Sequence, residues 1–165
     1  MQQITNDYQD TISKFLQLLS NFSAQQINSQ PVYGGWTPGQ VADHVSRAQW
    51  DMPAILKGNS QHTDRASDVK YPEIEKLFLH FDTKLTSPEI ILPGDGPYDK
   101  ITIINSISNR SAEITDAFLS SNPSMECLDF EIPGFGKFTP LEWMYFMICH
   151  TKRHIWQLEK MVGKV

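Results

Sequence analysis

The sequence predicts an all-α fold, a four-helix bundle with a small β-hairpin before the last helix. Four amphipathic stretches carry apolar residues at helical spacing, and the connections after the second and third of them are long. Between residues 128 and 132 apolar and acidic residues alternate, and a Pro-Gly turn follows, which predicts the hairpin. Because the chain has 165 residues and no low-complexity tract, we expect one domain over residues 1–165.

The first two helices are expected over residues 4–22 and 38–57. Apolar residues recur at intervals of three and four in the first of these stretches. The second begins with Thr37, which is typical of a helix N-cap, and Gln40 completes a capping box with it. Pro53 lies inside the second stretch and removes a backbone hydrogen bond, so we expect it to kink or tighten the last turn.

The segment over residues 59–98 is the least regular part of the chain, since it contains four prolines and two of the glycines. We expect a short helix over residues 73–81 and a brief strand over residues 90–92. A third long helix should begin after Asp99, a typical cap residue, and continue to about residue 120.

The last helix, expected over residues 140–162, carries the most informative pair of residues. Its start repeats the earlier signal, with Thr139 as the cap and Glu142 as the reciprocal capping residue, a role that explains Glu142 better than catalysis does. His150 and His154 stand four residues apart, so both imidazoles project from one face of the helix and could share one ion. The alternative interpretation is a hydrogen-bonded pair without a metal.

His44 on the second expected helix is the candidate for a third ligand. It lies seven residues past Thr37, and His150 lies eleven past Thr139, intervals close to two and three helical turns. Both rings therefore point toward the core, where each unpaired polar group costs about 1 to 3 kcal/mol. If the two helices are neighbours, His44, His150 and His154 converge, and an ion would satisfy them. The alternative is a metal-free polar network.

A three-histidine site would leave a divalent ion at least one open position, which a water should occupy. Zinc, nickel, iron and manganese are all compatible with imidazole ligands. Gln157 and Gln40, each one turn from a histidine, could orient ligands or water, or could be ordinary cap and surface amides. No general base is assigned, because Asp43 should point away from His44, and Asp51 is only a candidate to face the bundle.

Two further histidines and the two cysteines are also candidates for the metal site. His80 could be a fourth ligand, but a core or groove histidine is the favoured interpretation, and His62 is expected in a loop. Neither Cys127 nor Cys149 belongs to a Cys-x-x-Cys motif, so both are expected to be reduced thiols. For Cys127 a strand residue is favoured over a thiol near the site, and for Cys149 a small core residue is favoured over a metal ligand.

The charge and hydropathy of the chain argue against two classes of partner. The net charge is −5 and the basic residues are scattered, so nucleic acid is not an expected partner. The longest apolar run is far too short to cross a bilayer, and the N-terminus lacks the features of a signal peptide. We expect no membrane partner and a cytoplasmic location.

Three motifs resemble the DinB-like superfamily of small bacterial metalloproteins, and together they span most of the chain. They are Trp36-Thr37-Pro38-x-Gln40-Val41-Ala42-x-His44, Phe138-Thr139-Pro140-Leu141-Glu142-Trp143 and His150-Thr151-x-Arg153-His154-Ile155-x-Gln157-Leu158. The resemblance implies an antiparallel bundle with an up-down-down-up arrangement and frequent homodimerisation. It also implies a divalent metal held by His44, His150 and His154. Family members resemble thiol S-transferases that use low-molecular-weight thiols, or metal-dependent hydrolases or isomerases, and many have no known activity.

The leading hypothesis is a metal-dependent enzyme of hydrolase or thiol S-transferase type that acts on a small molecule. A low-molecular-weight thiol is one candidate substrate. The second hypothesis is a non-enzymatic metal-binding or interaction protein in which the ion only secures the bundle. The third is a metal-free bundle with a polar core network.

Overall fold

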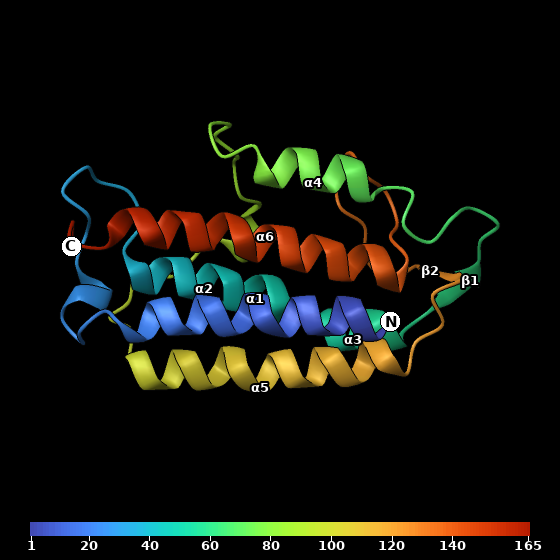
Figure 1. Cartoon of the computed structure of the whole chain (residues 1–165), viewed down its shortest axis with the longest axis horizontal. Helices are drawn as coiled ribbons and strands as arrows, with labels where there is room; N and C mark the ends of the chain where they lie inside the picture. Colours follow the sequence, from blue (N-terminus) through green and yellow to red (C-terminus); the bar gives the residue numbers. More distant parts are fainter.

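Helices make up most of the computed structural model, which describes residues 1–165 (Figure 1). The predicted all-α class is therefore confirmed in its main feature. The α-helices are α1 (Gln2–Ser20), α2 (Pro38–Gln49), α3 (Met52–Lys57), α4 (Tyr71–Leu79), α5 (Lys100–Leu119) and α6 (Pro140–Met161). Two 3-10 turns, η1 (Gln26–Asn28) and η2 (Glu89–Ile91), lie in the connections, and β1 (Ser60–His62) pairs with β2 (Met125–Cys127).

The four longest helices pack around one apolar core. Both α1 and α2 contact α5 and α6, so each of them lies against two neighbours. In Figure 1, the colours show that α1 and α6 run in one direction and α2 and α5 in the other. The core is rich in large aromatic side chains, among them Tyr8, Phe15, Phe118, Phe138 and Trp143.

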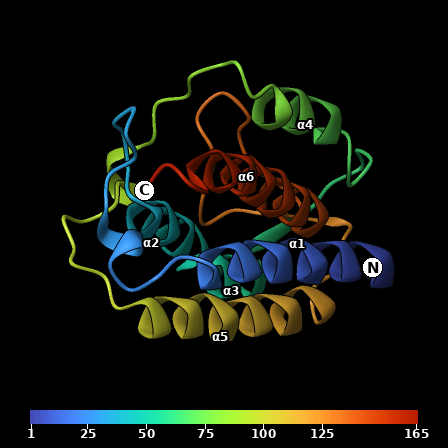
Figure 2. The same cartoon turned by 60° about the vertical axis from the view of Figure 1, so that its left-hand side comes forward.

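Helix α4 lies outside this group, packed against α6 (Figures 1 and 2). The chain that leaves α4 arches over α6 and comes down beside α2, where η2 contacts it (Figure 2). None of the helices combines the length and the apolar character that crossing a membrane requires.

The second predicted helix is interrupted and not merely kinked. Helix α2 ends at Gln49 and α3 begins at Met52, with Pro53 in its first turn. Proline has no N–H to donate to the carbonyl four residues earlier, and its ring crowds that carbonyl. For Pro53 that carbonyl belongs to Gln49, the last residue of α2, so the break falls where the proline requires it.

The predicted hairpin before α6 is reduced to a single bridge between Ile132 and Gly136. Strand β2 lies earlier in the chain, at residues 125–127, and its partner is β1. The two arms also meet further out, where the Phe138 carbonyl accepts the Cys127 N–H at 2.8 Å. Between these points the first arm is bound to another segment, since the Asp129 carboxylate accepts the Asn59 N–H at 2.8 Å. The continuous ladder of a hairpin is therefore not formed.

The brief strand predicted over residues 90–92 is also wrong, because the segment forms the 3-10 turn η2 after Pro88. No neighbouring strand pairs with it, and its backbone contacts α2 instead. The other predicted helices are confirmed within one or two residues: α4 begins at Tyr71, α6 ends at Met161, and the Asp99 side chain caps α5 by accepting the Thr102 N–H at 2.8 Å.

Candidate metal centre

Two capping boxes set the positions of the histidines along α2 and α6. Thr37 Oγ1 accepts the Gln40 N–H at 3.1 Å, and Gln40 Oε1 accepts the Thr37 N–H at 3.0 Å. Thr139 and Glu142 make the same reciprocal pair at 3.2 and 3.0 Å. Each box fixes the first turn of its helix, and therefore the direction of every side chain that follows.

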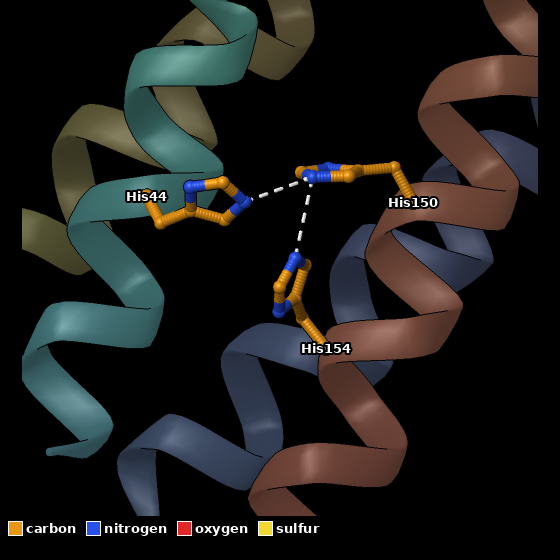
Figure 3. Close-up of side chains that lie close together, drawn as sticks. All are labelled: His44, His150 and His154. Atoms are coloured by element: carbon orange, nitrogen blue, oxygen red, sulfur yellow. Dashed lines mark hydrogen bonds between the residues drawn. The ribbon is translucent and has the colours of Figure 1, made fainter. Parts of the chain in front are cut away.

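The three predicted imidazoles meet between α2 and α6 (Figure 3). His150 Nε2 lies 3.0 Å from His44 Nε2 and 3.2 Å from His154 Nε2. All three side chains are buried, and one ring nitrogen of each lies within 4.8 Å of the others. The predicted convergence of residues from two helices is therefore present, and the cluster could hold a metal ion.

Hydrogen bonds on the outer nitrogens determine which nitrogen of two rings carries the proton. His44 Nδ1 donates to the Ile91 carbonyl at 2.7 Å, and His154 Nδ1 donates to Gln157 Oε1 at 3.0 Å. Because a carbonyl oxygen can only accept, both rings carry their proton on Nδ1 and present a lone pair at Nε2. These lone pairs point at His150 Nε2.

A metal-free network cannot satisfy all three rings. If His150 carries its proton on Nε2, it can donate well to only one of the two lone pairs that face it, and its own buried Nδ1 then lacks a donor. An ion would accept a lone pair from each ring. Three nitrogens bound to one tetrahedral zinc ion at about 2.0 to 2.1 Å lie about 3.3 Å from one another, close to the two short separations observed. The donor set therefore fits a divalent ion.

The His150 ring is positioned by packing, since its Nδ1 has no hydrogen-bond partner. Phe146, one turn earlier on α6, stacks on it at 5.5 Å between ring centroids and an interplanar angle of 17°. Phe78 of α4 meets it edge-on at 5.8 Å. Helix α4 thus contributes to the centre through an aromatic contact.

Burial keeps the three rings neutral. It lowers the pKa of His154 to about 3 and holds that of His150 well below its usual value, and the neighbouring histidines add to both effects. Burial also lowers the pKa of His44. Neutral imidazole is the form that binds a metal, so the site is prepared for ligation at neutral pH.

The carbonyl that His44 uses is held in place from α2 itself. Asp43 Oδ2 accepts the Gly94 N–H at 2.8 Å and the Tyr98 hydroxyl at 3.2 Å, and Gln40 Nε2 donates to the Gly94 carbonyl at 3.3 Å. Asp43 thus faces away from the His44 ring, as expected, while both residues secure the segment that positions it. Gln157 orients His154 directly, which is one of the two roles that the sequence left open.

Three other candidates lie outside the centre. His80 is exposed and its Nδ1 contacts Thr83 Oγ1 at 2.6 Å, so it is not a fourth ligand. His62 is exposed too, in strand β1 and not in a loop as predicted. Asp51 is exposed at the start of α3. It makes no hydrogen bond to the triad formed by His44, His150 and His154.

The two cysteines are free and buried. Cys127 lies in β2 and Cys149 in the core face of α6, as predicted. Burial raises the pKa of each thiol to about 11. Neither is therefore a thiolate near neutral pH, and neither belongs to the cluster of His44, His150 and His154.

A carboxylate–guanidinium pair near the start of α6 is a feature that the sequence did not reveal. Glu142, which is fully buried, accepts from Arg65 Nη1 at 2.6 Å and Nη2 at 2.8 Å, and from the Lys70 N–H at 3.0 Å. The pair clamps the connection before α4 onto α6. Only the capping pattern of Glu142 was visible in the sequence, because Arg65 lies in an irregular segment far from it.

The triad opens into a groove of about 1590 Å³ between α2, α6 and the arch that follows α4. Its walls include Trp36, whose ring lies 5.0 Å from that of His44, and the aromatic rings of Phe78, Phe146 and Trp156. The groove exceeds the usual volume of a small-molecule site, which is about 300 to 1,000 Å³. An ion at the triad would therefore face a space that admits an organic molecule.

A helical fold with a buried three-histidine cluster that could hold a metal defines the class of protein. The model of the DinB superfamily matches residues 7–158, and the chain belongs to this superfamily. It is also similar to the uncharacterized protein YuaE of Bacillus subtilis (strain 168), with 24% identity over 156 residues, which cover 89% of this chain and 90% of YuaE. No solved structure matches the chain significantly.

Proposed function

We propose that the protein is a metal-dependent enzyme of hydrolase or thiol S-transferase type that acts on a small molecule. His44, His150 and His154 would hold a divalent ion, with zinc, nickel, iron or manganese as candidates. The observation that carries the proposal is the meeting of three buried imidazoles at the base of an open groove. Three protein ligands and an open side are typical of catalytic centres, whereas structural sites are closed.

A divalent ion in this position would act as a Lewis acid and lower the pKa of a bound water or thiol. The protein residues would orient the ligands: the Ile91 carbonyl holds His44, Gln157 holds His154, and Phe146 holds His150. The aromatic walls of the groove would exclude bulk water around the reacting groups.

The surroundings of the triad favour thiol transfer over hydrolysis. A hydrolase commonly uses a side chain as general base or acid within hydrogen-bond reach of the attacking water. No carboxylate hydrogen-bonds to the three histidines, and Asp43, the nearest one in sequence, is engaged with Arg47 at 3.0 Å and with Gly94. Thiol transfer would need no such base, because an ion held by the three histidines would itself favour loss of the thiol proton.

The second candidate is a non-enzymatic metal-binding or interaction protein that uses the same bundle. It requires the position facing the groove to be closed by a further protein ligand. The groove beside the triad makes that arrangement the weaker proposal.

We also propose the family arrangement for the whole molecule. In it α1, α2, α5 and α6 form an antiparallel up-down-down-up bundle within one domain over residues 1–165. The opposed directions of these helices in Figure 1 support this assignment. The protein would be a cytoplasmic homodimer, and light scattering that gives a monomeric mass at micromolar concentration would contradict the dimer.

Metal content and reactivity test the proposed function together. Protein purified without chelator should contain about one divalent ion per chain, and His44→Ala protein should contain little. The metal-loaded protein is then assayed with low-molecular-weight thiols plus electrophiles, and separately with esters and amides. Thiol consumption that depends on the ion supports an S-transferase, and ester or amide cleavage a hydrolase. Absence of stoichiometric metal from the wild-type protein would overturn the proposal.

A further inference from the structure

Arg153 lies next to His154 on α6 and lines the same groove, but it has no acidic partner. Its Nη1 donates to the carbonyls of Phe78 and His80, each at 3.2 Å, and its Nη2 donates to the carbonyl of Thr83. A guanidinium has five N–H donors. The Nε–H and one Nη2–H remain without a protein partner.

A cation in this position is unfavourable for a metal site unless something balances it. Arg153 adjoins His154 in sequence and lines the groove into which the histidines open, so its charge would repel a metal ion that these rings would hold. A bound anion would offset the charges of the ion and of Arg153 together.

Two lysines add further positive charge to the groove that Arg153 lines. Lys84, from the arch after α4, and Lys160, two turns beyond Arg153 on α6, both line the groove and form no salt bridge. Lys160 Nζ lies 3.6 Å from the centre of the Trp156 ring. Arg153 and Lys160 thus lie on α6, the helix of His154, and Lys84 follows Thr83, whose carbonyl accepts from Arg153.

The acidic residues of the groove do not neutralise these cations. Asp43 pairs with Arg47 at 3.0 Å on α2. Asp51 lies at the start of α3, and Glu131 lies in the connection before α6, and neither contacts a groove cation within salt-bridge distance. The unbalanced positive charge is thus located beside the triad.

We propose that the substrate bound at this centre carries a carboxylate, which pairs with the free Nε–H and Nη2–H of Arg153 while the reacting group reaches the ion. Two parallel N–H groups of a guanidinium match the spacing of two carboxylate oxygens, which favours a planar carboxylate as the ligand. The inference rests on the proposed function, since it needs a ligand at the open side of the metal site. It assigns Arg153 to substrate recognition and Lys84 and Lys160 to attraction of the anion.

Binding of simple mercaptocarboxylates to cobalt-loaded protein tests this assignment without an activity assay. Cobalt(II) reports coordination of a thiolate through its visible absorption spectrum. Mercaptopropanoate and mercaptohexanoate are titrated, each against its neutral amide. The wild-type protein should bind the acid of at least one pair about tenfold more tightly than its amide, the size expected for one charge-assisted pair. Arg153→Gln should abolish this preference without changing the spectrum of the cobalt protein before thiol is added.

Lys152→Gln is the matched control. Lys152 precedes Arg153 on α6 and is exposed, but it does not line the groove, so the same change of charge should leave the preference intact. Equal binding of acid and amide by the wild-type protein overturns the assignment, as does a preference that survives in Arg153→Gln. The wild-type comparison needs no variant, so equal binding of acid and amide overturns the assignment even if Arg153→Gln fails to fold. If neither thiol of either pair alters the spectrum, the S-transferase form of the proposed function fails, and the carboxylate assignment fails with it.

Discussion

The Nε2 atoms of His44 and His150 lie 3.0 Å apart, at the contact between α2 and α6. Helix α6 carries two of the three histidines and α2 carries the third, so neither helix holds the complete donor set. An ion bound by all three would connect the two helices directly. Metal binding and helix packing are therefore expected to stabilise each other.

Loss of one histidine should remove tight metal binding. In His154→Ala protein only one nitrogen on each helix remains, and two ligands hold a divalent ion much less firmly than three. Elemental analysis after dialysis should then give well below one ion per chain. His80→Ala is the control, since His80 is exposed and outside the triad. Full retention of metal in His154→Ala would contradict the ligand set.

Gln157 should matter for metal affinity although it would not touch the ion. It accepts the hydrogen bond from His154 Nδ1 at 3.0 Å and so fixes the ring's orientation. Loss of such an outer partner typically weakens metal affinity about 10- to 100-fold. Competition with a chromogenic chelator should show this for Gln157→Ala, and Gln17→Ala, a change of an exposed glutamine on α1, should have no effect. Equal affinities would show that packing alone orients His154.

Arg65→Met should destabilise the fold without touching the triad. It leaves the buried Glu142 carboxylate without its guanidinium, and breaking a buried pair in this way costs about 3 kcal/mol or more. Urea unfolding monitored by circular dichroism measures the change. Lys14→Met, which breaks an exposed pair with Glu159, should cost less than about 1 kcal/mol. Similar losses in the two variants would mean that the Glu142 pair contributes no more than a surface contact.

The metal-free protein should lose stability as the pH falls from 7 to 5. The pKa values of His44, His150 and His154 are lowered by burial in the native state, whereas the unfolded chain binds protons on these rings near pH 6.5. Below about pH 6.5 the unfolded state therefore binds more protons, and each ring that stays neutral in the native state reduces stability by up to about 1.4 kcal/mol per pH unit.

Thermal unfolding in chelator across this pH range measures the effect. The fall should be smaller in His154→Leu, and His62→Ala should leave it unchanged, because the His62 ring is exposed in the native state. A melting temperature that stays constant between pH 7 and 5 would contradict the burial of neutral rings.

The parts of the structure that the sequence predicted depend on short-range signals. Thr37 with Gln40, and Thr139 with Glu142, mark where α2 and α6 begin, and the intervals from each cap to His44 and His150 give the direction of the rings. These relationships involve neighbours on one helix, so spacing alone reveals them. Spacing does not predict that α2 and α6 are neighbours. The convergence of the three histidines depends on that contact, and the structure contains it.

Features that depend on pairing between distant segments were missed. The sequence shows that Pro88 breaks the chain, but not that the following Ile91 carbonyl binds His44. Nor does it show that Arg65 reaches Glu142, or that β2 finds its partner strand in β1. Such contacts depend on how separate segments pack, and no local periodicity encodes them.

The paired capping boxes have a consequence for how this chain tolerates insertion and deletion. One residue added between Thr37 and His44, or between Thr139 and His150, would rotate the imidazole by about 100° and carry it out of the cluster. Residues added to the connections outside the helices would leave both intervals intact. Natural variation in length should therefore accumulate in the connections between helices. The intervals of seven residues from Thr37 to His44 and eleven from Thr139 to His150 should stay constant.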